Sequence, residues 1–170
     1  MPRARAVQSI FIKAPPEDVY DFALGDLSSL ADWLTSVEQV EEADPNWPAV
    51  GSSYVYSREV GRRSVRGRTT VLEAERPRRV VMREDLELED APTPAAPPDD
   101  RVGRSVWTFE PDRGGTQVTM EAVSVEMRTV MYALWRVLLS GRIGGTVEAT
   151  LTSLKRICED ELEDATADEG

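Results

Sequence analysis

The stretch from Met127 to Leu162 constrains the fold of this chain more than any other, because it lacks proline and its apolar residues recur at helical spacing. In its second half they step by four, three and four residues along one helix face: Val147, Leu151, Leu154 and Cys158. A single helix over the stretch would be about 54 Å long, whereas a compact domain of this length has a radius of gyration near ~15 Å. The helix must therefore break or protrude, and we predict a break or kink at Gly141–Gly145.

Upstream of this stretch, segments rich in branched and aromatic residues alternate with turn signals, which is typical of strands. The expected strands are 4–13, 36–43, 52–60, 64–74, 79–88, 101–110 and 116–126. Two short helices are expected after the first strand, one ending at Gly25 and one starting near Asp26. Tight turns are expected at Gly61-Arg62 and Gly114-Gly115.

The order of these elements predicts the fold class. Short turns between consecutive strands indicate an antiparallel sheet, and a sheet of seven strands curls. Only the C-terminal helix is long enough to cover its concave face, so we expect an α+β fold. We expect one domain over residues 1–162 and an acidic, disordered tail at 163–170. The proline-rich segment 91–98 is either a disordered hairpin tip or a loop over a site.

Composition excludes several classes of function. The 170 residues carry a formal charge of −11, which argues against nucleic acid and against stable binding to an anionic membrane. Histidine is absent, which removes Ser-His-Asp and Cys-His catalysis and the common zinc sites. The single cysteine, Cys158, excludes an internal disulfide, and its place on an apolar helix face predicts a buried thiol. We expect no metal and no cofactor.

Targeting signals are also missing from the sequence. No apolar run approaches the ~20 residues of a spanning helix, and Met1–Arg5 lacks the apolar core of a signal peptide. We therefore expect a cytoplasmic protein.

Several segments together carry a resemblance to a known family: Ile10–Tyr20, Asp26–Trp33, Val50-Gly51, Trp107–Pro111 with Gly114–Thr116, and Leu151–Glu159. On these segments the chain resembles the START-like (SRPBCC) superfamily, in its polyketide cyclase/dehydrase branch, from about Ala4 to about Glu159. The resemblance implies a helix-grip fold, with a ligand cavity between the curled sheet and the long helix. Members include lipid carriers, hormone receptors and aromatic cyclases, so the fold alone does not assign the chemistry.

Aromatic and apolar side chains would either line such a cavity or fill the core. The candidates are Trp33, Tyr54, Tyr56, Trp107, Phe109, Met120, Tyr132 and Trp135. Small residues at inner positions would leave volume unfilled: Gly67, Thr69, Ala122, Ser124, Gly144 and Gly145. Tyr54, Tyr56 and Arg58 share one strand face, where they could hold a carbonyl or a carboxylate. The alternative is an outward row, with Val55 turned inward.

Three residues are weak candidates for acid–base catalysis: Tyr56, Glu84 and Glu121. A carboxyl group in an apolar cavity has a raised pKa and can exchange protons near neutral pH. A phenol in a dry site offers an acid for enol chemistry. The alternative for each glutamate is a strand end or a pair with an arginine.

These residues leave three functions open. The leading one is binding or transport of a small hydrophobic ligand, a lipid or a polyketide-like molecule. The second is a cyclase or dehydratase that uses Tyr and Glu acid–base chemistry, and the third is a regulatory or stress-related interaction protein without ligand chemistry. The segment 130–139 is apolar almost all round, which predicts a gate, a homodimer contact, a transient membrane contact or burial against the sheet.

Overall fold

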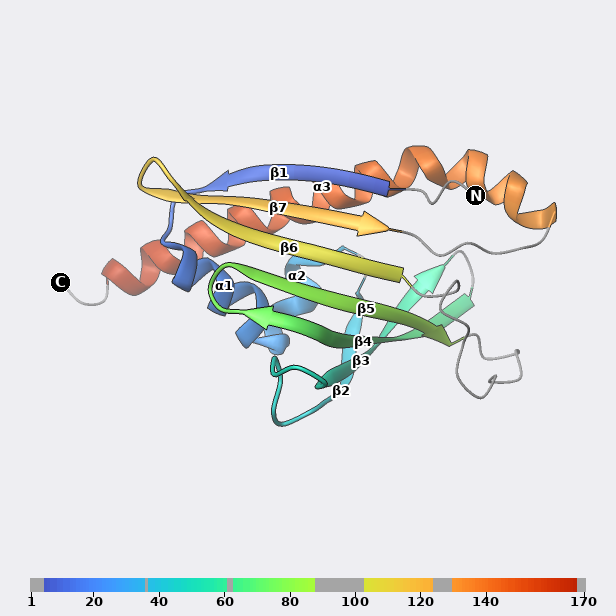
Figure 1. Ribbon diagram of the computed structural model, residues 1–170, viewed down its shortest axis with the longest axis horizontal. Helices are drawn as coiled ribbons and strands as arrows, with labels where there is room; N and C mark the ends of the chain where they lie inside the picture. The colour runs from blue at the N-terminus through green and yellow to red at the C-terminus, as the bar shows by residue number, and fades with distance from the viewer. Residues whose placement is uncertain (1–4, 36, 61–62, 88–102, 124–129, 168–170) are drawn as a thin grey trace.

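A curved seven-stranded antiparallel sheet and a long C-terminal helix form the computed structural model (Figure 1). The structure describes residues 5–35, 37–60, 63–87, 103–123 and 130–167, without the side chains at 59–60, 63–65, 86–87 and 130–146. Its elements are β1 (Arg5–Ile12), α1 (Pro16–Gly25), η1 (Leu27–Ser29), α2 (Leu30–Trp33), β2 (Gln39–Ala43), β3 (Ser53–Val60), β4 (Arg63–Glu75), β5 (Arg79–Glu87), β6 (Gly103–Asp112), β7 (Gly115–Val123) and α3 (Val130–Ala167). The proline-rich segment 91–98 and Ser124 lie outside the described residues.

The strand order confirms the predicted α+β helix-grip class. The order across the sheet is β1-β7-β6-β5-β4-β3-β2, and every neighbouring pair is antiparallel. Consecutive strands from β2 to β7 are therefore neighbours, as short turns require. The first strand, β1, lies at the edge of the sheet beside β7. No helix in the described part of the chain has both the length and the apolar character needed to cross a bilayer.

The turn between β6 and β7 lies one residue earlier than predicted. Its two central residues, Arg113 and Gly114, both have positive φ, at 45° and 82°. Such a pair forms the tight hairpin turn whose twist matches that of the strands. Gly115 instead belongs to β7 and pairs with Asp112. A Cβ at Gly115 would lie 2.4 Å from the carbonyl oxygen of Ile12, so the glycine allows β1 to approach closely.

The predicted break at Gly141–Gly145 is wrong, because α3 is one uninterrupted helix from Val130 to Ala167. A kink there, the other form of that prediction, stays a prediction. The length argument left protrusion as the other solution, and this is what Figure 1 shows. The orange N-terminal turns of α3 extend past the ends of β1 and β7, while the following part runs alongside β1. The helix also continues through residues 163–167, within the expected tail. The proposed domain limit at residue 162 stays a prediction.

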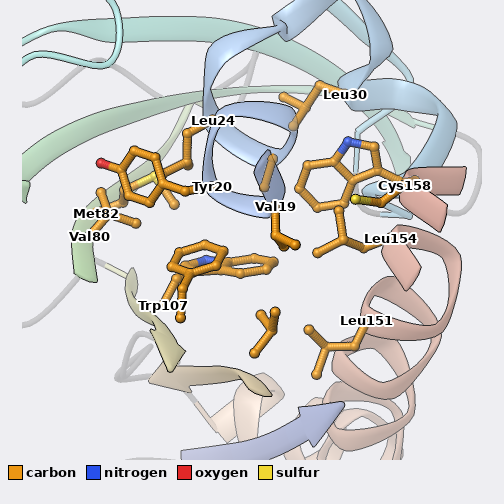
Figure 2. Packing of buried hydrophobic residues seen from close by; sticks show 14 of the residues in the cluster. Val19, Tyr20, Leu24, Leu30, Val80, Met82, Trp107, Leu151, Leu154 and Cys158 are labelled. Carbon is orange, nitrogen blue, oxygen red and sulfur yellow. The ribbon is translucent and has the colours of Figure 1, made fainter. Parts of the chain in front are cut away.

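The second half of α3 packs its predicted face against the inside of the sheet. Its four apolar positions are at most 3% exposed: Val147, Leu151, Leu154 and Cys158. Figure 2 shows Leu154 beside Val19 of α1, with Leu151 extending into the same interior. Each side chain buried in this way contributes about 1.5–3 kcal/mol. Burial also raises the pKa of the Cys158 thiol to about 12, so the expected buried cysteine is confirmed.

The short helices fill one end of the interior. Pro16 occupies the first turn of α1 and Glu17 and Asp18 follow it, as the positive end of a helix dipole favours. The ring of Tyr20 meets Phe109 of β6 edge-on at 5.2 Å between centroids, and the Trp33 ring meets that of Trp107 at 5.9 Å. This end of the concave face is therefore covered by aromatic contacts.

Candidate functional site

The aromatic row on β3 faces the interior, which decides between the two orientations that the sequence left open. Tyr54 and Tyr56 are 4% and 1% exposed and belong to the core cluster, and their ring centroids lie 6.0 Å apart. The side chain of Val55 alternates with those of the two tyrosines, so it projects from the opposite face of the sheet. The outward row with Val55 turned inward is wrong.

Tyr56 lies across β4 and reaches β5. Its hydroxyl donates a hydrogen bond to the Oε1 of Glu84, two strands away. The residue opposite Tyr56 on β4 is Gly67, and a Cβ there would lie 2.3 Å from the Cζ of the tyrosine ring. We expected Gly67 to leave empty volume. Instead, the Tyr56 ring occupies the space beside it.

Glu84 is the acid among apolar residues on the inner face of β5. It alternates with Met82 and Val80, both buried in the core. Burial raises the pKa of its carboxyl group from 4.5 to about 7, and the neighbouring charge of Asp85 adds to this rise. Both protonation states of Glu84 are therefore populated near neutral pH. Burial also raises the pKa of Tyr54 well above its ordinary value, so this phenol stays neutral.

Arg58 lies two residues after Tyr56 and four after Tyr54 on β3, so the three side chains project from the same face. Its Nε is buried and has no hydrogen-bond partner within the described part of the chain. Burial lowers the pKa of the guanidinium, but an arginine stays protonated in proteins. The site therefore holds a partly buried positive charge.

The other candidates lie either at the closed end of the interior, which the aromatic contacts beside α1 cover, or along the sheet. Trp33, Trp107 and Phe109 lie in the core, and the indole N–H groups of both tryptophans are buried without a partner among the described residues. Met120 is only partly buried and stands opposite Trp107 on β7. The side chains of Tyr132 and Trp135 lie outside the described part of the structure. Whether any of these residues contacts a ligand stays a prediction.

Glu121 lies apart from the inner row. It alternates with the inner residues Met120 and Ala122, so it leaves the outer face of β7. Its side chain is 29% exposed and forms an ion pair of 2.7 Å with Arg5 of β1. The structure thus gives it the arginine pair that we named as the alternative to an acid in the cavity.

Two residues beside the inner row escaped the sequence interpretation. Gly103 of β6 is opposite Glu84, and a Cβ there would lie 3.4 Å from the Cβ of that glutamate. Thr69 of β4, proposed only as a small residue, stands between Glu84 and Tyr54 in the register. The available signal was the pair of small residues at inner-face positions of β4 and β6, the two strands beside β5, which marks space for a large neighbour.

The inner face becomes less buried away from the aromatic end. At that end Val80, Trp107 and Val118 are at most 3% exposed. Toward the opposite end, inner positions on three adjacent strands are only partly buried: Ala6, Ser105, Met120 and Ala122. Glu84 is level with Gly103 at the start of β6, on this less buried side. The acid is thus near the part of the inner face that solvent still reaches.

Comparison with known proteins gives a family and a fold. Residues 3–159 match the family described as polyketide cyclase / dehydrase and lipid transport. A protein of Thermus thermophilus, TTHA0849, is similar in structure, with a TM-score of 0.68 and 22% identity over 91% of this chain and 96% of its own. No curated protein matches the chain.

Two other similar structures carry functional names. The di-domain ARO/CYC StfQ from the steffimycin biosynthetic pathway has a TM-score of 0.66 and 12% identity, over 95% of this chain and 52% of its own. The Aha1 dimer from Colwellia psychrerythraea has a TM-score of 0.60 and 18% identity, over 91% of this chain and 96% of its own. At these identities the likeness establishes the shared fold.

Proposed function

Because the chain belongs to the polyketide cyclase / dehydrase and lipid transport family, we propose that it binds or carries a small hydrophobic ligand, a lipid or a polyketide-like molecule, between the sheet and α3. The observation that carries this proposal is the polar group of Arg58, Tyr56 and Glu84 on a largely apolar inner face. Ligand sites are typically apolar, with a few polar groups that fix orientation.

The uneven burial of the inner face supports the same function. Side chains fill the end beside α1, whereas Ala6, Ser105 and Ala122 on the other side stay partly exposed. The apolar N-terminal half of α3 is the part of the chain that would control uptake there or form a dimer contact. This role for residues 127–139 is a proposal.

Binding of a neutral hydrophobic dye such as Nile red tests the function. We expect a saturable rise in fluorescence in the wild-type protein. Ala122→Phe fills the inner face and should weaken dye binding at least tenfold. Val123→Phe, which changes the next residue on the opposite face, is the matched control and should leave it unchanged. Dye binding that does not saturate, or that both variants retain, would contradict a ligand site between sheet and helix and would favour the interaction protein.

A second function, a cyclase or dehydratase, has its own supporting observation. Glu84 has a pKa of about 7 and accepts a hydrogen bond from Tyr56. As a carboxylate, Glu84 would take a proton from the carbon next to a carbonyl, and the Tyr56 hydroxyl, released from Glu84 as that carboxylate becomes protonated, would donate to the developing enolate oxygen. The protonated Glu84 would then return this proton to a β-hydroxyl group, which leaves as water while the enolate electrons form the carbon–carbon double bond and the carbonyl is restored.

Proton exchange separates catalysis from binding. We expect the wild-type protein to speed the exchange of α-protons of 2-decanone into heavy water, measured by NMR. Glu84→Gln should lose about 10²-fold or more of this rate and still bind the dye. No acceleration over protein-free buffer would refute the enzyme and leave the binding function standing.

We propose two further properties, a homodimer and a cytoplasmic location. A similar structure is that of the Aha1 dimer, and light scattering of the purified chain would test whether two copies associate. A cytoplasmic location stays a prediction, which fractionation of the source cells would test.

A further inference from the structure

Arg58 carries a charge that none of the described residues matches. Its guanidinium follows the two inward tyrosines on β3, its Nε is buried, and none of the described residues forms a hydrogen bond or ion pair with it. Taking a cation out of water without a partner is costly. By contrast, arginines on the outer face have acidic neighbours, such as Arg83 with Asp85 at 3.0 Å and Arg104 with Glu73 at 3.7 Å.

The acid on the same face is engaged elsewhere. Glu84 accepts the hydrogen bond of Tyr56, and Gly67 leaves the space that lets the tyrosine ring reach it. In the register, Arg58 is opposite Val65, whereas Glu84 is opposite Thr69, four residues along β4. Glu84 therefore does not serve as the counterion of Arg58.

The other buried donors without a partner lie at the closed end of the interior. Among the described residues, three buried side-chain atoms lack a hydrogen-bond partner, and all three are N–H donors: Trp33 Nε1, Arg58 Nε and Trp107 Nε1. A ligand beside Arg58 must bring an acceptor for its Nε. A neutral carbonyl would satisfy the N–H groups but would leave the guanidinium charge without a counterion.

We propose that the ligand of this site is an amphipathic monocarboxylate, whose carboxylate pairs with Arg58 and whose hydrocarbon part lies along the inner face of the sheet. A carboxylate is acceptor-only when ionised and matches the planar fork of a guanidinium. This inference rests on the proposed binding function and narrows its ligand class. A hydrogen bond to a charged group contributes enough for a ten- to hundredfold preference over an uncharged analogue.

Displacement of Nile red by two compounds of equal chain length tests the inference. Dodecanoic acid and 1-dodecanol differ only in their head groups, and at pH 8 the acid is ionised. We expect the wild-type protein to bind the acid at least tenfold more tightly than the alcohol. Arg58→Gln should lose this preference and keep the affinity for the alcohol, while Arg58→Lys should keep part of it. Arg104→Gln, on the outer face, is the matched control and should behave as the wild type.

The outcomes of this experiment test the carboxylate inference and the binding function separately. Equal affinity for acid and alcohol in the wild type, or a preference that survives in Arg58→Gln, would overturn the carboxylate inference and leave the binding function intact. Dye that binds but is displaced by neither compound would do the same. No saturable dye binding at all would refute the proposed function itself. Urea unfolding of Arg58→Gln should give a midpoint no lower than that of the wild type, because the variant removes an unpaired charge.

Discussion

Replacing Gly67 by alanine should destabilise the protein and separate Tyr56 from Glu84. The added Cβ would lie 2.3 Å from the Cζ of Tyr56 and 2.5 Å from its hydroxyl oxygen, far inside contact distance. The ring is 1% exposed and its hydroxyl is held by Glu84, so it cannot swing away without displacing its neighbours. The expected response is a shift of the ring and loss of its hydrogen bond.

The sign of the effect is what makes this substitution informative. In an open strand position, Gly→Ala stabilises by about 0.5–1 kcal/mol, because it restricts the unfolded chain. Overpacking at a buried contact costs about 1–3 kcal/mol, and the lost hydrogen bond costs about 0.5–1.5 kcal/mol more. The net change is a loss of roughly 1–3 kcal/mol, which lowers Tm by about 3–10 °C in a domain of this size.

Gly103→Ala is the matched control, because it adds the same methyl group on the same face. There the new Cβ would lie 3.4 Å from its nearest neighbour, the Cβ of Glu84, at ordinary contact distance. Urea and thermal unfolding of both variants would measure the difference, and we expect Gly103→Ala to be neutral or slightly stabilising. If Gly67→Ala is as stable as Gly103→Ala, the close contact between β4 and Tyr56 does not exist as described.

Three further changes test other parts of the structure. Because the pKa of Glu84 is raised, its contribution to stability is present below about pH 4.5 and is lost as the pH rises through about 7. The loss is at most ~3 kcal/mol. Glu84→Gln should remove it, so the unfolding free energy of this variant should fall less than that of the wild type between pH 5 and pH 8. Leu154→Ala empties a site that is 0% exposed and should cost about 2–5 kcal/mol, whereas a loss below about 1 kcal/mol in urea unfolding would contradict its burial. Arg76→Gln breaks an exposed ion pair with Asp21, 2.6 Å long, and should leave the urea midpoint almost unchanged, because solvent screens such a pair; a large drop would contradict its exposure.

The sheet was predictable because its signals are local. Alternation along 79–88 placed Glu84 on the apolar face with Val80 and Met82, and the structure keeps that face. The orientation of Tyr54 and Tyr56 was open, because both faces of β3 carry apolar residues and only packing decides between them. The contact of Tyr56 with Glu84 joins residues 28 positions apart across an intervening strand. No local pattern encodes such a contact, since it depends on the register of two strand pairs.

The wrong break in α3 has a different cause. A helix continues as long as its own backbone hydrogen bonds form, so the compactness of the domain does not decide where it ends. Glycine costs about 1 kcal/mol relative to alanine in a helix interior, so the three glycines at 141–145 weaken this segment without ending it. The apolar residues that precede them continue the helix past the edge of the sheet (Figure 1).

The charge of the whole chain sharpens the ligand that an interior arginine would select. At −11 the protein repels anions at a distance, but this repulsion is screened beyond about 8 Å at physiological salt. Selection must therefore come from the short-range pairing with Arg58 and from burial of apolar surface. A ligand with several negative charges would meet the repulsion without gaining a second cation, because Tyr56 and Glu84 supply none. One carboxylate on a hydrocarbon body satisfies the single guanidinium and leaves the rest of the affinity to the apolar wall.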